Sequence, residues 1–388
     1  MLQISKEDRR WVESIWDKIT LKMSAQCDRL GASLPYSAFN GRYSDRTKNN
    51  KTDIFWWTNG FWPGILWLMY HASNDDKYLN AARQIELKFD EALAGFEGLH
   101  HDVGFMWTLA SVLDFRLTGD KTALTRALHA ANLLAGRYNP RGKFIRAWNR
   151  DCTGWIIIDC MMNLSLLFWA SEQTQDPRFK FVAEEHADTA LKYLVREDGS
   201  CNHIAILDPV SGALVETPAG QGYASGSSWT RGQAWALYGF AITYAHTGGI
   251  RYLEAARRVA QYFCGEAARH GYVPPVDFRA PEQPKITDTS AGAIAACGLL
   301  KLSEIVSADS GSPDNAAGAD YYLQNALNII KAAEASYCDW DTSTDGLVKM
   351  ATAQYHDKHD EMHVSLIYGD YFFMEAVDKL RGSEIQIW

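Results

Sequence analysis

The sequence predicts an all-α fold in which six helical hairpins close into an (α/α)6 barrel, a single domain that covers residues 1–388. Two observations carry this prediction. Six segments are apolar almost all round, as helices buried on every side must be, and the segments between them keep charges on one face. Because the two kinds alternate along the chain, we expect inner and outer helices to alternate around one ring.

Each of the six apolar segments opens with a polar or aromatic cluster, and the recurrence of such a unit is typical of repeat folds. The segments are WTNGFWPGILWLMY from Trp57, DVGFMWTLASVLDF from Asp102, DCMMNLSLLFWA from Asp159, WTRGQAWALYGFAITY from Trp229, DTSAGAIAACGLLKL from Asp288 and DYFFMEAVDKL from Asp370. We assign them to the inner wall of the barrel.

The predicted outer helices carry apolar residues three and four positions apart. Their apolar positions are Trp11, Ile15 and Ile19; Tyr78, Ala82, Ile85 and Phe89; Leu124, Ala127, Ala131 and Leu134; the stretch 179–194; Tyr252, Ala255, Val259 and Phe263; and Tyr322, Ala326, Ile329 and Ala333. Gly136 is a helix stop signal, and Asp176-Pro177 is a start signal. Residues 307–320 are expected to form a surface loop, and residues 203–217 a β-hairpin with its turn at 209–212.

Strict alternation makes every inner helix run in the same direction, so all inner N-termini lie at one end of the barrel. The residues that open the inner segments are therefore expected to rim one cavity: Trp57, Asp102, Asp159, Trp229, Arg231, Asp288 and Asp370. Free N–H groups and the positive ends of the helix dipoles favour an anionic ligand at such a rim.

Composition and charge narrow the classes of partner. A formal net charge of −9 argues against a nucleic-acid or anionic-membrane surface, because both need a basic patch. The most apolar stretch, residues 156–170, is interrupted by Asp159 and Asn163 and is too short to span a bilayer. We therefore expect neither nucleic acid nor a membrane as a partner.

The first residues and the cysteines of the chain both bear on where the protein is located. The N-terminal stretch MLQISKEDRRWVESIW carries charges where a secretory signal has its apolar core. The seven cysteines are scattered, odd in number and without a CxxC motif, a pattern that fits reduced thiols. We expect a cytoplasmic protein, a monomer or a weak homodimer.

Asp102 and Asp159 are the candidate catalytic residues. Both carboxylates stand directly beside dense apolar sequence, and burial raises the pKa of a carboxyl toward the range that a general acid needs near neutral pH. The alternative is that each aspartate only caps its helix, because Asp is a preferred N-cap residue.

Candidate substrate-binding residues follow in the Gly/Ser-rich stretch QGYASGSSWTRGQAW, which starts at Gln221. Arg231 could hold a carboxylate in bidentate fashion, and Trp229 or Trp235 could stack on a sugar ring. The alternative is an arginine paired with an acidic residue and two core tryptophans. His203 precedes the predicted strand as a possible hydrogen-bond donor, and Trp148 is a loop tryptophan flanked by two arginines.

The segment YHDKHDEMH at 355–363 contains His359, Asp360 and His363, which raises the question of a metal site. We predict no metal and no other cofactor, because there is no HExxH motif and no cysteine partner. Tyr355 and His356 are better candidates for lining the cavity mouth. No GxSxG, P-loop or GxGxxG motif favours a serine hydrolase, an NTPase or a dinucleotide-binding enzyme.

Taken together, the motifs WWTNGFWPGILWL, HHDVGF, IIIDCMMNL, GSSWTRGQAWALYGFA, DTSAGAIAACGLL and YGDYFFMEA resemble the unsaturated glucuronyl hydrolases of glycoside hydrolase family 88, in that family's order and nearly end to end. The resemblance implies an (α/α)6 barrel that acts, without a metal, on the 4,5-unsaturated uronic acid left by polysaccharide lyases at a non-reducing end.

The resemblance also implies roles for residues. The aspartate at 159 protonates C4 of the vinyl ether and activates the water that adds at C5, after which the hemiketal opens and releases the remaining sugar. Asp102 assists by holding substrate hydroxyls. The implied substrate-binding positions are Trp57, Trp148, His203, Gln221, Arg231 and Trp235, with Tyr355 and His356 on the aglycone side.

One departure from the family pattern bears on specificity. Members that favour sulfated glycosaminoglycan disaccharides carry serines and a lysine where this chain has Gln354 and Asp357. Unsulfated glycosaminoglycan, gellan-type, xanthan-type and ulvan-type fragments stay open as substrates. Three alternatives also stay open. One is of the same class, an unsaturated rhamnogalacturonyl hydrolase; the other two are a sugar 2-epimerase-like isomerase, which would need paired histidines facing the cavity, and a non-catalytic helical toroid.

Overall fold

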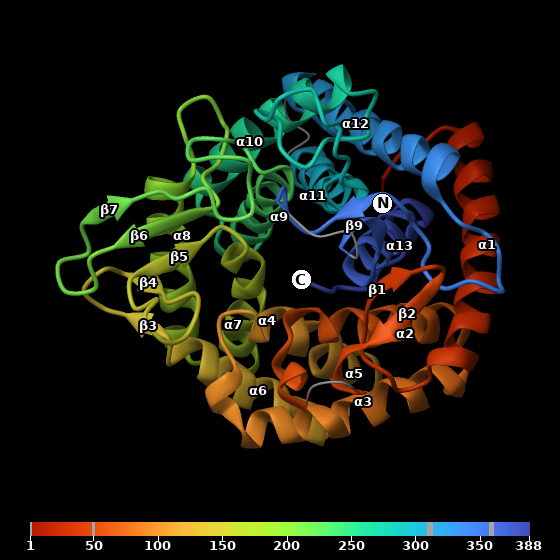
Figure 1. Cartoon of the computed structure of the whole chain (residues 1–388), viewed down its shortest axis with the longest axis horizontal. Coiled ribbons are helices and arrows are strands. Elements are labelled where there is room, and N and C mark those ends of the chain that lie inside the picture. The colour runs from red at the N-terminus through yellow and green to blue at the C-terminus, as the bar shows by residue number, and fades with distance from the viewer. Residues whose placement is uncertain (1, 49–50, 309–312, 357–360) are drawn as a thin grey trace.

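The computed structural model of the chain describes residues 2–48, 51–308, 313–356 and 361–388. Within these residues the long helices form two concentric rings (Figure 1). The outer ring consists of α1 (Lys6–Leu30), α3 (Asp76–Ala94), α6 (Lys121–Ala135), α8 (Pro177–Leu194), α10 (Ile250–Arg269) and α12 (Pro313–Tyr337). The inner ring consists of α2 (Phe61–Ser73), α4 (Val103–Trp107) with α5 (Leu113–Thr118), α7 (Cys160–Thr174), α9 (Thr230–Thr247), α11 (Thr289–Ala308) and α13 (Ile367–Arg381).

The (α/α)6 barrel predicted from the sequence is confirmed. A π-helical turn at Thr108–Val112 joins α4 to α5, so these two count as one inner helix. Inner helices pack against their neighbours around the ring, and α13 closes it against α2. In α9, every residue from Thr230 to Thr243 is buried, which explains why the inner segments have no polar face.

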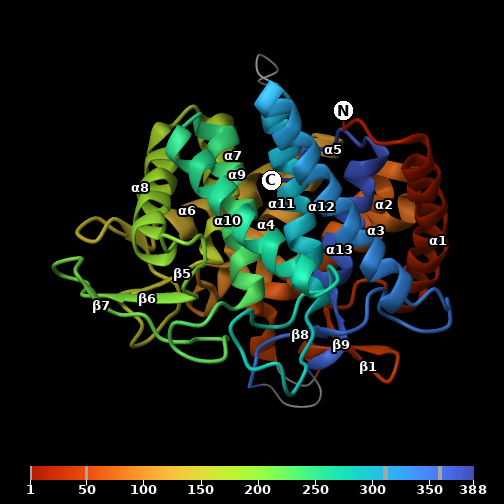
Figure 2. The ribbon, with the colours of Figure 1, turned by 90° about the horizontal axis from the view of Figure 1, so that it is seen from above.

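Short turns connect four of the inner helices to the outer helices that follow them. Each of these turns is two residues long, at 74–75, 119–120, 175–176 and 248–249. The first residue of each turn adopts the left-handed conformation, and in three of them the second is an aspartate that caps the outer helix. These turns all lie at the far end of the barrel, away from the strands (Figure 2).

The connections from outer to inner helices are long, and they carry the strands of the structure. One antiparallel sheet has the order β2 (Arg42–Asp45), β1 (Pro35–Phe39), β9 (Met362–Leu366) and β8 (Ala351–Thr352). A second has the order β5 (Trp155–Ile157), β6 (Ile204–Leu207) and β7 (Leu214–Glu216), and β3 (Tyr138–Asn139) pairs with β4 (Phe144–Ile145). Figure 2 shows the strands together at the end where the inner helices begin, which we call the mouth.

The sequence located the β-hairpin correctly but not the surface loop. Strands β6 and β7 pair as predicted, and the Asp208 side chain accepts hydrogen bonds from the backbone of the turn at Val210 and Ser211. The loop predicted at 307–320 is wrong for most of its length, since α11 continues to Ala308 and α12 begins at Pro313, and residues 309–312 lie outside the described part. A proline is accommodated in the first turn of a helix, where its missing N–H costs nothing.

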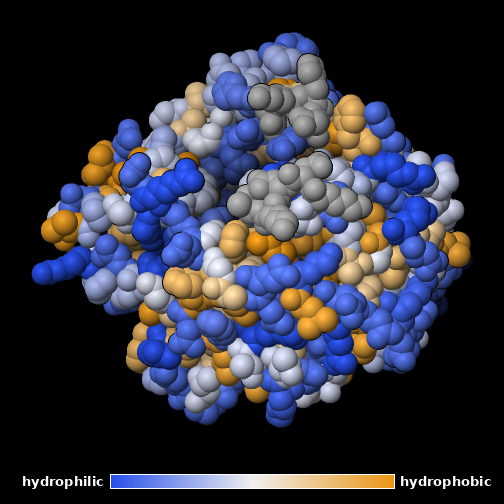
Figure 3. All heavy atoms as spheres, turned by 60° about the horizontal axis from the view of Figure 1, so that its bottom comes forward, coloured by the Kyte–Doolittle hydropathy of each residue, from blue (hydrophilic) through white to orange (hydrophobic). Residues whose placement is uncertain are grey.

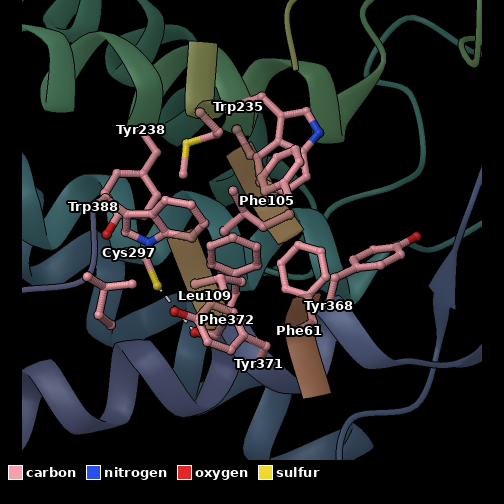
Figure 4. Packing of buried hydrophobic residues seen from close by; sticks show 14 of the residues in the cluster. Phe61, Phe105, Leu109, Trp235, Tyr238, Cys297, Tyr368, Tyr371, Phe372 and Trp388 are labelled. Atoms are coloured by element: carbon pink, nitrogen blue, oxygen red, sulfur yellow. Dashed lines mark hydrogen bonds between the residues drawn. The ribbon is translucent and has the colours of Figure 1, made fainter. Parts of the chain in front are cut away.

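An aromatic core fills the middle of the barrel (Figure 4). The ring of Trp388 stacks on Phe372 with centroids 6.0 Å apart, and Phe105 meets both Trp388 and Trp235. The last residues of the chain therefore reach into the centre of the ring, where Figure 1 places the C-terminus. Helix α11 is long and apolar enough to cross a membrane by composition alone, but 72% of that window is buried inside the barrel, as an inner helix requires.

Candidate functional site

Asp102 and Asp159 each stand immediately before an inner helix, but neither acts as a cap. Neither side chain accepts a hydrogen bond from the first turn of its helix, although Asp75, Asp120 and Asp176 on the outer helices all do. The capping alternative for these two residues is therefore wrong. Their carboxylates stay available for a ligand.

Asn163 links the two aspartates across the interface between α4 and α7. Its amide nitrogen lies 3.3 Å from Oδ1 of Asp102 and 3.4 Å from the carbonyl oxygen of Asp159, and its Oδ1 accepts from the backbone N–H of Phe105 at 2.7 Å. The approach is close because Gly104 faces Asn163: a Cβ at Gly104 would lie 2.5 Å from the Cα of Asn163. Glycine therefore holds the two helix starts together.

Two histidines that the sequence analysis did not select surround Asp102. His100 Nδ1 lies 3.3 Å from Asp102 Oδ2, and His101 Nε2 lies 3.2 Å from Asp102 Oδ1. The pKa of Asp102 is raised to about 6, mainly because of burial, while His100 opposes the shift and the neighbouring Asp159 charge favours it. Burial also lowers the pKa of His100 and of His101 to about 4, so both imidazoles are neutral near pH 7. The sequence run HHD at residues 100–102 is the signal that could have identified these two histidines.

The raised pKa of Asp102 predicts a pH dependence of stability. A carboxyl whose pKa is higher in the folded than in the unfolded chain contributes stability that is complete below pH about 4 and is lost as the pH rises through about 6. The wild type should therefore lose stability relative to Asp102→Asn as the pH rises. The difference between their free energies of unfolding should fall by up to about 3 kcal/mol between pH about 4 and pH about 8. Denaturant titrations of both proteins at pH about 4 and pH about 8 measure this difference, and a difference that stays constant would contradict the raised pKa.

His203 faces the second aspartate. Its Nδ1 accepts the backbone N–H of Gln221 at 2.9 Å, so the ring proton sits on Nε2, which lies 3.5 Å from Oδ1 of Asp159. The ring of Trp229 packs against His203 with centroids 4.3 Å apart. The predicted residues His203, Gln221 and Trp229 are therefore brought together beside Asp159.

Arg231 is also close to this group, and two of its three guanidinium nitrogens are occupied, whereas Nε has no hydrogen-bond partner among the described residues. Nη1 donates to Asp288 and to the carbonyl of Thr352, and Nη2 donates to the carbonyl of Ala353. The side chain is 1% exposed and lies between the rings of Trp229 and Tyr368. The two Nη groups already hold the loop at β8, so they are not free for the expected bidentate contact, and Nε is the guanidinium atom that stays without a partner among the described residues.

The structure corrects three further sequence expectations. Trp235 is fully buried between Phe105 and Phe372, so its ring belongs to the core and not to the rim (Figure 4). Asp288 and Asp370 are also fully buried. Asp288 accepts from Ser290 and Thr352 besides Arg231, and Asp370 accepts from Tyr43, Leu347 and Val348, so both tie mouth loops to inner helices.

The remaining predicted residues lie at the mouth. Trp57 is half-buried, with its ring 4.9 Å from that of Tyr368, and Trp148 is half-buried beside His101 and Trp155. The backbone N–H of Tyr355 donates to the carbonyl of Gln221, and Nε2 of the exposed His356 lies 2.9 Å from the carbonyl oxygen of Tyr223. Of the YHDKHDEMH segment, residues 357–360 lie outside the described residues; His363 Nε2 accepts from the backbone of Thr287.

Four buried polar atoms around the two aspartates have no hydrogen-bond partner among the described residues: His100 Nδ1, His101 Nε2, Asp159 Oδ1 and His203 Nε2. Buried polar atoms are costly to leave unpaired, and polar groups gathered in this way mark a place for a polar ligand. A sugar hydroxyl both donates and accepts, so a sugar ring can satisfy such a group. Half-buried Trp57 and Trp148 offer apolar ring faces nearby.

A helical barrel with two carboxylates that cap no helix, among aromatic side chains at one mouth, fits the class of glycoside hydrolases, which act with paired carboxyl groups. The model of Glycosyl Hydrolase Family 88 matches residues 36–269, and the chain belongs to this family. An unsaturated glucuronyl hydrolase from Bacillus sp. (strain GL1) is 34% identical over 387 residues, covering 97% of this chain and 98% of the relative. An unsaturated chondroitin disaccharide hydrolase from Streptococcus agalactiae serotype III (strain NEM316) is 30% identical, covering 94% and 90%.

Solved structures agree with these relatives. The crystal structure of an unsaturated glucuronyl hydrolase from Streptococcus agalactiae has a TM-score of 0.88 at 28% identity, covering 100% of this chain and 95% of that one. A structure described with dGlcA-Glc-Rha-Glc has a TM-score of 0.87 at 34% identity, covering 96% and 97%. These likenesses favour neither the isomerase nor the non-catalytic toroid.

Proposed function

We propose that this glycoside hydrolase releases 4,5-unsaturated glucuronic acid from the non-reducing end of oligosaccharides that lyases generate. The observation that carries the proposal is the pair of carboxylates, Asp102 and Asp159, that begin adjacent inner helices without capping them. The names of the relatives support it, since they describe unsaturated glucuronyl and unsaturated chondroitin disaccharide hydrolases.

The proposed reaction begins at the double bond. Asp159 gives its proton to C4, and the positive charge that develops at C5 and O5 is stabilised by the neighbouring carboxylates. Water adds at C5 and returns a proton to Asp159. The resulting hemiketal opens to a ketone, and the acyclic hemiacetal at C1 collapses and releases the remaining sugar. Because no group attacks C1, the separation of the two carboxylates does not set a stereochemical outcome.

We propose that the enzyme prefers substrates that carry no sulfate group. One relative's structure is described with dGlcA-Glc-Rha-Glc and another's with dGlcA-GalNAc6S, so the family accommodates both kinds of aglycone. In this chain Gln354, a neutral residue, stands in the stretch where the resemblance implies the sulfate-binding serines and lysine. A neutral amide offers a sulfate less electrostatic attraction than a lysine does.

A panel of unsaturated disaccharides tests both parts of this proposal. The protein should abolish the ultraviolet absorbance of the conjugated C4=C5 bond, with a higher kcat/KM for unsulfated than for 6-sulfated chondroitin disaccharide. Retained absorbance across all linkages, gellan-, xanthan- and rhamnogalacturonan-derived substrates included, would contradict the activity. A higher kcat/KM for the 6-sulfated disaccharide would contradict only the preference.

We further propose that the enzyme works in the cytoplasm as a monomer or weak homodimer. All seven cysteines are free, as reduced thiols would be. On the face drawn in Figure 3, hydrophobic side chains are scattered among hydrophilic ones, which fits a weak self-association at most. Fractionation of cells and sedimentation of the purified protein are the corresponding measurements.

A further inference from the structure

Three consecutive residues at the mouth, His100, His101 and Asp102, bring two imidazole nitrogens and a carboxylate together. One ligand-type atom from each lies within 4.8 Å of the other two. The nitrogen of each ring lies beside a different carboxylate oxygen, at 3.3 Å for His100 and 3.2 Å for His101. The proposed reaction assigns proton transfer to Asp159 and gives the two histidines no step.

The orientation of His101 is fixed from outside this cluster. Its Nδ1 lies 2.9 Å from the carbonyl oxygen of Ala147, which can only accept, so Nδ1 carries the ring proton and donates it. Nε2 of the neutral ring then points an electron pair at Asp102 Oδ1. Two acceptors that face each other at 3.2 Å repel unless a proton or a metal cation lies between them.

Both nitrogens are free to bind that cation. His101 is 1% exposed, and neither its Nε2 nor the buried Nδ1 of His100 has a hydrogen-bond partner in the described part of the chain. A histidine whose other ring nitrogen donates to a backbone carbonyl is the arrangement that metal-binding histidines use. His101 and Ala147 form such a pair.

The distances fit a transition metal. Zinc binds nitrogen at about 2.0–2.1 Å and carboxylate oxygen at about 2.0–2.2 Å, so neighbouring ligand atoms lie about 3.3 Å apart. The two nitrogen-to-oxygen distances match this value, at 3.3 Å from His100 to Oδ2 and 3.2 Å from His101 to Oδ1 of the Asp102 carboxylate. Two neutral imidazoles and one carboxylate are also ligands that zinc prefers, and three protein ligands leave a position open.

We propose that His100, His101 and Asp102 form a binding site for a zinc-class divalent transition-metal ion, and that the bound ion blocks the mouth. The ion would take up the carboxylate and the nitrogen lone pairs that a sugar would otherwise contact. Metal binding itself is independent of the proposed hydrolysis, whereas inhibition by the metal rests on it.

Zinc binding can be measured without any substrate. Protein freed of metal by a chelator is titrated with ZnCl2 in a calorimeter, and with Co²⁺ while its visible absorption is recorded. We expect one zinc that is lost or bound at least about tenfold more weakly in His100→Gln and in His101→Gln. His129→Gln, which changes an exposed histidine on α6, is the matched control and should bind like the wild type.

Equal zinc affinity in the wild type and in both site variants, or no binding to the wild type, would overturn the proposal. If the buried His101 variant fails to fold, the half-buried His100 variant decides. Zinc should also raise the apparent KM for an unsaturated disaccharide, and a chelator should reverse the effect. Zinc bound at this site in a protein that hydrolyses no such substrate would refute the proposed function and leave the metal site standing.

Discussion

Replacing Asp159 by asparagine should reduce turnover of an unsaturated disaccharide by about a thousandfold or more, while the protein still folds and binds. General acid and base catalysis by one group contributes about 10²–10⁴-fold, and here one carboxyl is assigned both steps. An amide can neither give a proton to C4 nor take one from water. The fold should persist because the Asp159 side chain does not cap α7. Steady-state kinetics and thermal unfolding measure the two effects.

The matched control is Asp151→Asn, which removes an exposed carboxylate from the same connection between α6 and α7. It should keep wild-type turnover. Two results would count against the assignment: an Asp159→Asn protein that retains more than about a tenth of the activity, or one that unfolds and so shows a structural role.

Gly104→Ala should lower both stability and activity, because it separates the starts of α4 and α7. The new methyl group would lie 2.5 Å from both Cα and Oδ1 of Asn163, and a backbone atom cannot move aside as a side chain can. Overpacking of this kind costs about 1–3 kcal/mol. The shift would also disturb the hydrogen bond from Asn163 to Asp102, and a displacement of about 1 Å at a reacting group can cost about a hundredfold in rate.

Gly265→Ala provides the comparison for this substitution. Gly265 lies inside the outer helix α10, and a Cβ there would meet no atom within 4 Å. Alanine is the better helix former by about 1 kcal/mol, so this variant should be at least as stable as the wild type and equally active. If Gly104→Ala behaved in the same way, the close approach at Asn163 would not be what positions the two aspartates.

The sequence predicted the fold well because local patterns decide it. Inner helices lack a polar face and outer helices have one, and aspartates such as Asp120 and Asp176 mark where outer helices start. The same patterns failed at 307–320, where a polar, glycine-containing stretch resembles a loop although most of it is helical. The pairing of β5 with β6, and of β1 with β9, joins strands far apart in the chain, and no local pattern shows such contacts.

The candidate site was only partly predictable for a related reason. The position of a residue at the N-terminus of an inner helix does not determine where its side chain points. Asp102 and Asp159 lie among buried polar atoms that have no hydrogen-bond partner in the described part of the chain. Asp288 instead accepts from Arg231, and Asp370 accepts from the backbone of a mouth loop. Trp235 follows Trp229 by less than two helical turns but points into the core. The ring of His101 is oriented by its hydrogen bond to the carbonyl oxygen of Ala147, and no sequence motif reveals this contact.

The central claim is that the enzyme delivers a proton to the carbon–carbon double bond and leaves the anomeric carbon alone. The most direct measurement compares initial rates on two disaccharides that differ only at C4 and C5 of the terminal uronic acid, one unsaturated and one saturated. The account predicts release of the second sugar from the unsaturated compound and none above background from the saturated one. Comparable rates on both would show attack at the anomeric carbon and contradict the account.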